Sequence, residues 1–160
     1  MEKQEDLITN TKTAVIDSFS LYSIAVSHCP QGQSLRISAE NGEIQLVTSA
    51  AALAVAFSMR TCWDDECDKE HPRATEASVQ EFYERGGVEV AELTSAEAMS
   101  AGRLYIGCNE KRIAGAEVLA ACHSVLLAES RAATLISTVR ATYCYTAIPE
   151  TATSRRIALN

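Results

Sequence analysis

Short apolar segments alternate with longer amphipathic ones along most of the chain, and this alternation limits the possible folds more than any other feature. The predicted strands are residues 13–16, 44–47, 88–93, 133–137 and 156–159. Strands separated by helices usually pair in parallel, because the helix carries the chain back to the edge where the previous strand began. We therefore predict an α/β fold: a three-layer α/β/α sandwich with a mostly parallel sheet of about five strands.

Apolar residues at helical spacing fill the intervals between these strands. The predicted helices are 18–26, 50–59, 75–85 with Thr75 as the cap, one opening at Thr94 or Ser95, 113–129 and 140–146. Ser49 is a suitable N-cap for the helix over 50–59. If Thr94 is the cap of the next helix, Glu97 stands in the capping-box position. Pro30-Gln31-Gly32 predicts a break in the chain.

One stretch supports two interpretations. Asn41-Gly42, between LRIS and EIQLV, is by itself a strong hairpin signal. Alternatively, residues 35–40 form a short helix that stops at Asn41-Gly42 and leads into the strand over 44–47. We prefer the helix because it continues the alternation of the remaining chain.

Length and charge restrict the class of protein. The 160 residues suffice for one domain, which we place at residues 13–160 after a polar leader over residues 1–12. No segment is apolar for the length of a membrane span, and we expect a cytoplasmic protein. The net charge of −7 provides no general attraction to RNA, so RNA binding would need a local basic patch. Arg112, Arg131, Arg140, Arg155 and Arg156 are candidates, but the sequence does not show that they converge.

Five phrases, in their order and spacing, resemble the PIN domain, the fold of many metal-dependent ribonucleases and bacterial toxins. They are TAVIDSFSLYSIAV, LVTSAAALAVAF, GVEVAELTSAEAMSAGRLY, IAGAEVLAACHSVLLAES and ATLISTVRATY, and together they span residues 13–148. The resemblance implies acidic residues that converge at one end of the sheet and hold Mg²⁺ or Mn²⁺, hard cations that prefer oxygen ligands. Such an ion would activate water for phosphodiester cleavage.

Carried over residue by residue, the resemblance gives an incomplete site. Asp17 matches the first acidic position and Glu117 the third. The second and fourth positions fall at Val55 and Val139, and valine cannot bind a hard cation. Ser137 stands where threonine is usual, and Ser18 is a candidate supporting residue. The alternative is a purely structural role, in which Asp17 ends a strand or caps a helix and Glu117 is a surface carboxylate.

Two other clusters are weaker candidates. Cys62, Cys67 and His71 have a spacing wider than that of common zinc sites, and we interpret CWDDECDKEH as an acidic loop in which one carboxylate could replace a missing ligand. Cys122 and His123 are adjacent on a helix and therefore point in different directions, so we expect a packed thiol and a partly exposed imidazole rather than a catalytic pair.

Two functions follow from the resemblance. The first is a PIN-like protein with a degenerate nuclease site that acts without catalysis as an interaction or regulatory module, with no resident metal. The resemblance implies a homodimer or a protein partner such as an antitoxin. The alternative is a toxin-type, Mg²⁺- or Mn²⁺-dependent ribonuclease in which Asp17 and Glu117 are the surviving ligands and RNA is the substrate.

Overall fold

The fold is described from a computed structural model, which covers residues 12–26, 30–59, 72–149 and 156–159. Its strands are β1 (Thr13–Ile16), β2 (Gln45–Ser49), β3 (Glu89–Ala91), β4 (Thr134–Thr138) and β5 (Arg156–Leu159). Its helices are α2 (Ser18–Val26), α3 (Pro30–Glu40), α4 (Ala50–Ser58), α5 (Pro72–Glu84), α6 (Ser95–Glu110), α7 (Ala116–Arg131), the 3-10 turn η1 (Val139–Ala141) and α8 (Thr142–Tyr145).

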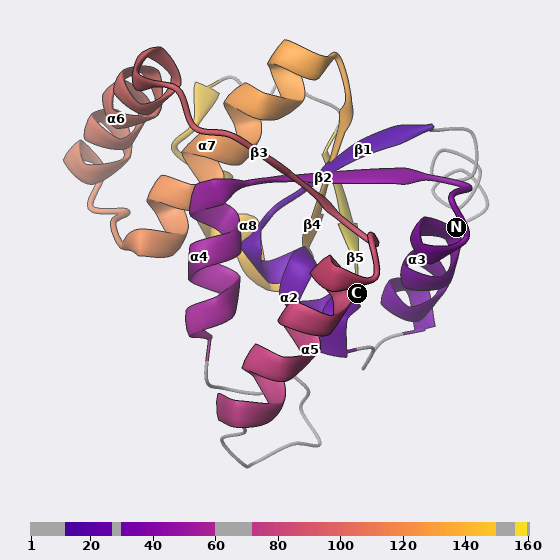
Figure 1. Cartoon of the computed structure of the whole chain (residues 1–160). Helices are drawn as coiled ribbons and strands as arrows, with labels where there is room; N and C mark the ends of the chain where they lie inside the picture. Colours follow the sequence, from indigo (N-terminus) through magenta and orange to yellow (C-terminus); the bar gives the residue numbers. More distant parts are fainter. Residues whose placement is uncertain (1–11, 27–29, 60–71, 150–155, 160) are drawn as a thin grey trace.

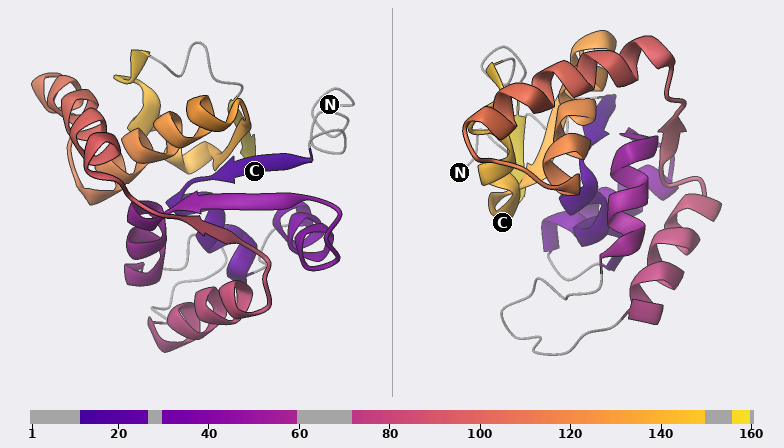
Figure 2. Two further views of the ribbon diagram at one scale, coloured as in Figure 1. Left: turned by 45° about the horizontal axis from the view of Figure 1, so that its top comes forward. Right: turned by 90° about the vertical axis from the view of Figure 1, so that its left-hand side faces the viewer.

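The strands form one sheet in the order β3-β2-β1-β4-β5, and every neighbouring pair is parallel (Figure 1). Helices cover both faces (Figure 2). The predicted three-layer α/β/α architecture is therefore confirmed, with the sheet wholly parallel. Among the described residues, no helix is both long and apolar enough to cross a lipid bilayer.

Alternation along the strands divides the apolar residues into two core clusters. Val15, Val47 and Leu135 pack with residues of α6, α7 and α8 on one face. Ile16, Leu46 and Ile136 belong to the other cluster, with residues of α2, α3, α4 and α5. A strand residue and its neighbour point to opposite faces, so a central strand needs apolar residues at every position.

The helix interpretation of residues 35–40 is confirmed, but the predicted break at Pro30 is wrong. Helix α3 begins at Pro30 itself and ends before Asn41-Gly42, where Gly42 has a φ of 74° and its N–H donates to Ala39 O. The N–H of the first helical residue has no acceptor within the helix. Proline, which lacks an N–H, can therefore begin a helix as well as end one. For the same reason α5 starts at Pro72, and the prediction of Thr75 as its cap is wrong.

Other boundaries shift by a few residues. Thr94 caps α6 in a complete capping box, since its hydroxyl accepts from Glu97 N and its own N–H donates to Glu97 Oε2. Helix α7 starts at Ala116 rather than 113, after Gly115 with a φ of 131°. Strand β3 is shorter than predicted. The predicted leader lies outside the described residues except for Lys12.

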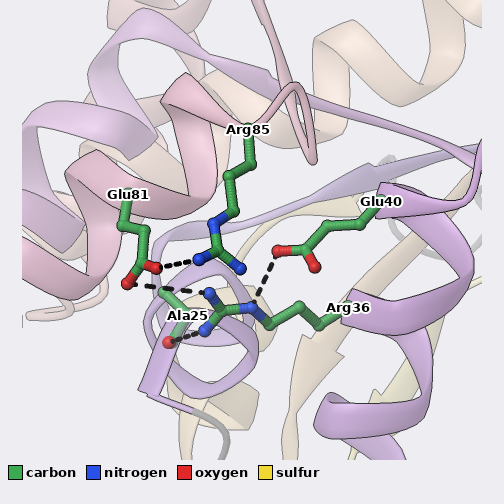
Figure 3. A network of polar contacts seen from close by, with 5 residues as sticks. All are labelled: Ala25, Arg36, Glu40, Glu81 and Arg85. Atoms are coloured by element: carbon green, nitrogen blue, oxygen red, sulfur yellow. Dashed lines mark hydrogen bonds and ion pairs between the residues drawn. The ribbon is translucent and has the colours of Figure 1, made fainter.

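A polar network fixes the outer helices on the α2 side of the sheet (Figure 3). Arg36 of α3 donates from Nη1 to Ala25 O at 2.7 Å, near the end of α2, and from Nε to Glu40 at 3.0 Å. Its guanidinium also lies over the Phe82 ring and 3.9 Å from Glu81, both on α5. One half-buried cation thus ties together three helices.

Candidate functional site

The candidate site lies at the carboxyl edge of the sheet, where β1 and β4 end side by side. Asp17 directly follows β1, and its N–H donates to Ile136 O of β4 at 3.2 Å. Only 1% of Asp17 is exposed. Ligands of open α/β folds bind at this edge, so the position is the one that a functional acid would occupy.

Both oxygens of the Asp17 carboxylate accept hydrogen bonds within the chain. Oδ1 accepts from Ser20 N at 2.8 Å and lies 2.8 Å from Ser20 Oγ. Oδ2 accepts from the Tyr145 hydroxyl at 2.5 Å. The bond from Ser20 N is that of an N-cap, so Asp17 caps α2, which is the structural role that its sequence position left open.

Arg156 of β5 packs over the ring of Tyr145. Its guanidinium carbon lies 4.6 Å from the centre of the Tyr145 ring. Its Nε donates to Ser137 Oγ at 2.7 Å, and one terminal nitrogen donates to Thr138 O at 3.3 Å. Arg156 is therefore held by the end of β4 and places a positive charge over the ring that covers Asp17.

Burial has the largest effect on the pKa of the Asp17 carboxyl group. It raises the pKa of Asp17 above the ordinary 3.8, while the hydrogen bonds from Tyr145 and Ser20 and the charge of Arg156 oppose the rise. Burial, together with the neighbouring carboxylate, also raises the pKa of Tyr145. Tyr145 therefore stays protonated and donates a hydrogen bond to Asp17.

Glu117 lies in the first turn of α7 and is more open. Its Oε1 accepts from the hydroxyl of Tyr143 at 3.1 Å. Its carboxylate lies against Gly115, where a Cβ atom would come within 2.7 Å of Oε1. Gly115 also has the positive φ that disfavours other residues, so this glycine both starts α7 and makes room for the Glu117 side chain.

Helix α8 links the two acids. Tyr145 bonds to Asp17 and Tyr143 bonds to Glu117. Between them, burial raises the pKa of Cys144 to about 12, and the negative charges of Asp17 and Glu117 add to that rise. The two carboxylates therefore lie at the same end of the molecule, each held by a different tyrosine of one short helix.

The described residues do not fit the metal centre that the resemblance implies. No group of three or more His, Cys, Asp or Glu side chains among them is placed to hold an ion. Val55 is half-buried on α4, and Val139 is 54% exposed just after β4. Asp17, whose two oxygens face donors, is sealed from solvent. The loop with Cys62, Cys67, His71 and its carboxylates lies outside the described residues.

The architecture has a counterpart among solved structures. It is similar to a chain of the crystal structure of VapBC2 from Rickettsia felis bound to a DNA fragment from their promoter. The TM-score is 0.59 and the sequence identity 16%, over 92% of this chain and 99% of that chain. The fold is PIN-like. At this identity the likeness concerns the fold alone. The chain matches no protein-family model and no curated protein.

Asp17 and Glu117 could be named as candidates from the sequence, whereas the residues that contact them could not. Ser18 is buried, yet the serine bonded to Asp17 is Ser20. Ser137 accepts from Arg156. Asp17 and Ser20 are three positions apart, a capping pattern that could have been recognised locally. Tyr145 is 128 residues from Asp17, and no local pattern indicates that contact.

Cys122 and His123 do not form a catalytic pair in the structure. Cys122 is fully buried beside Cys108, and burial raises the pKa of Cys122 to about 12. His123 is only 8% exposed, so the expectation of a partly exposed imidazole is wrong. Burial lowers the pKa of His123, while Glu97 partly offsets this effect. Its side chain lines a small cavity with Ser49, Glu92 and Glu97.

Proposed function

We propose that this protein is a PIN-like domain with an incomplete metal site that acts as a non-catalytic interaction module. The observation that supports the proposal is the state of Asp17. Its two oxygens accept from Ser20 and Tyr145, and almost none of its surface is exposed. A carboxylate that serves a metal ion must turn a lone pair toward the ion, and this one turns toward donors of its own chain.

The partner in this proposal is a protein. The similar solved chain comes from a complex, VapBC2, bound to a DNA fragment. The net charge of −7 favours a protein partner over RNA, because a phosphate backbone repels a chain of this sign. The valines at positions 55 and 139 leave two of the four expected ligand positions apolar.

An alternative is a metal-dependent ribonuclease with Asp17 and Glu117 as ligands. It draws support from the placement of both acids around α8, at the edge of the sheet where such a site belongs. It would require Tyr145 to leave Asp17 and at least one further ligand to approach. For these reasons we rank it second.

RNA cleavage and thermal stability, each with and without Mg²⁺ or Mn²⁺, distinguish the two functions. The variants are Asp17→Asn, Glu117→Gln and, as a control, Glu43→Gln, an exposed carboxylate at the opposite edge of the sheet. We expect no cleavage and no change in Tm on adding either metal. Metal-dependent cleavage that Asp17→Asn abolishes and Glu43→Gln preserves would overturn the proposal and establish the nuclease.

A further inference from the structure

The side chain of His123, on α7, is polar and buried but has no hydrogen-bond partner. Only 8% of the residue is exposed. Neither ring nitrogen forms a hydrogen bond with any residue that the structure describes. The ring lines a cavity of about 20 Å³, which is enough space for one water molecule. Buried polar groups are normally paired, so an imidazole in this state calls for an explanation beyond packing.

The ring is covered by the β3–α6 corner, which we define as residues 92–100. Glu92, Leu93 and Glu97 of this corner line the cavity. The structure describes the whole corner, and none of its residues is buried; the first buried residue of α6 is Ala101. Segments with little buried apolar surface are those that open locally. In Figure 1, α6 lies at the periphery of the molecule, next to α7 and away from the sheet, so its start can move alone.

The ionisable groups that line the cavity with His123 are Glu92 and Glu97. Burial lowers the pKa of His123 below the ordinary 6.5, and the charge of Glu97 offsets only part of this effect. Glu97 is also engaged elsewhere, since its Oε2 accepts from the N–H and the hydroxyl of Thr94. These bonds lower the pKa of Glu97 most, and the charge of Arg131 on α7 adds to their effect. Strand β2 and helix α4, which also pack against α7, have no ionisable side chain. The closed corner therefore favours a neutral His123.

We propose that the β3–α6 corner is an acid-sensitive cover, which opens when His123 takes up a proton. Opening the corner lets water reach the ring, and water stabilises an imidazolium better than a small buried cavity does. Because the open state binds the proton more tightly, acid shifts the population from the closed corner to the open one. The corner begins after the last residue of β3, so the strands keep their pairing. The proposal involves neither Asp17 nor Glu117 and goes beyond the proposed function.

Amide hydrogen exchange from about pH 7.5 to about pH 5, corrected for the intrinsic effect of pH on exchange, tests the cover. The N–H of Ala98 donates to Thr94 O, so its protection, measured by NMR, reports on the corner. We expect this protection to fall about threefold to thirtyfold in the wild type. The upper limit is the preference for the protonated form of an imidazole with a pKa of 6.5 at about pH 5. The amides of β1 should stay more strongly protected throughout.

Three variants separate the titration of His123 from other effects of acid. His123→Leu removes the titrating ring and leaves no unpaired polar group, so the fall in Ala98 protection should disappear. Glu97→Gln keeps an acceptor for Thr94 but removes the charge that favours a protonated ring in the closed corner, so the fall should become larger. Glu110→Gln changes an exposed carboxylate at the other end of α6, and this matched control should behave as the wild type does.

Melting temperatures establish that every variant folds. Unchanged Ala98 protection in the wild type, or the same fall in His123→Leu, would overturn the proposal. Equal protection of Ala98 and of the β1 amides would do so too, because the chain would then open only as a whole. An NMR titration of the wild-type ring needs no variant, and a pKa of His123 at or above 6.5 would contradict the cover. The metal and RNA assays concern Asp17 alone, so this inference and the proposed function can fail separately.

Discussion

At the scale of single residues, Asp17 carries out two structural tasks with one side chain. Its Oδ1 caps α2 through Ser20, and its Oδ2 anchors α8 through Tyr145. Ser20 Oγ also lies 2.8 Å from Ile136 O, which joins the cap to β4. A buried carboxylate is tolerated only where donors surround it, and here Ser20 N and the Tyr145 hydroxyl donate to it from two separate segments.

Tyr145→Phe should destabilise the protein far more than Tyr143→Phe. The first change leaves Asp17 Oδ2 buried without its donor, and we expect a loss of about 1–3 kcal/mol in the free energy of unfolding. The second removes a bond to Glu117 from a residue that is 45% exposed, and we expect a loss below about 1 kcal/mol. Urea unfolding of both variants measures the difference, and equal losses would contradict the role assigned to Tyr145.

The free energy of unfolding should depend on pH in the way that the raised pKa of Asp17 predicts. Because its pKa is raised in the folded state, the folded chain holds this proton more tightly than the unfolded chain. Its contribution to stability is therefore fully present below pH 3.8 and is lost as the pH rises through the raised pKa. Glu97, whose pKa the bonds from Thr94 lower, contributes in the opposite direction, as does His123.

The difference between wild type and Asp17→Asn isolates this contribution. Asparagine keeps an oxygen for Ser20, and the Tyr145 hydroxyl can turn to accept from its amide nitrogen. We expect the variant to gain stability relative to the wild type as the pH rises from about 4 to 7. Unfolding free energies at several pH values measure this, and parallel pH profiles would show that Asp17 titrates as it does in the unfolded chain.

At the scale of elements, the helices on the α2 side depend on one arginine. The Arg36 side chain is 16% exposed and connects α2, α3 and α5. That of Arg85 is 57% exposed and, within the part of the chain that the structure describes, forms an ion pair with Glu81 four residues earlier (Figure 3). Surface pairs of the second kind contribute little because water competes for both charges. The two arginines therefore provide a matched comparison.

Arg36→Met should cost about 1–3 kcal/mol in the free energy of unfolding, because Ala25 O and Glu40 lose their charged donor. Arg85→Met should cost below about 1 kcal/mol. Chemical denaturation gives both numbers. If the two substitutions have the same effect, the Arg36 network does not hold the helices together.

At the scale of the whole molecule, three buried thiols report on global opening. Cys108, Cys122 and Cys144 are free and buried in the core cluster on the α6–α7 face. Burial raises the pKa of Cys122 and of Cys144 to about 12 each, so the reactive thiolate is scarce at neutral pH. We expect iodoacetamide to label these cysteines only in denaturant, as followed by peptide mass spectrometry. Rapid labelling of native Cys144 would show that α8 opens locally.

The sequence predicted the layers of this fold because periodicity is a local property. Each strand and helix has enough apolar residues at its own spacing to be recognised alone, and Thr94 with Glu97 marks a helix start within four residues. The starts of α3 and α5 were predicted too late because proline both ends and starts helices, and both helices begin at a proline. The residues that cover Asp17 could not be predicted from the sequence, because Tyr145 and Arg156 come near Asp17 only in the folded chain.

The strand order has a consequence for how the chain reaches this structure. Strand β1 lies at the centre, with β2 on one side and β4 on the other, so Ala14 pairs with both Leu46 and Thr134. During synthesis β1 emerges first but must wait for about 120 further residues before its second neighbour exists. Pairings this distant slow folding and leave an unpaired strand edge open in the meantime. Until β4 and α8 are synthesised, neither Ile136 nor Tyr145 is available to contact Asp17.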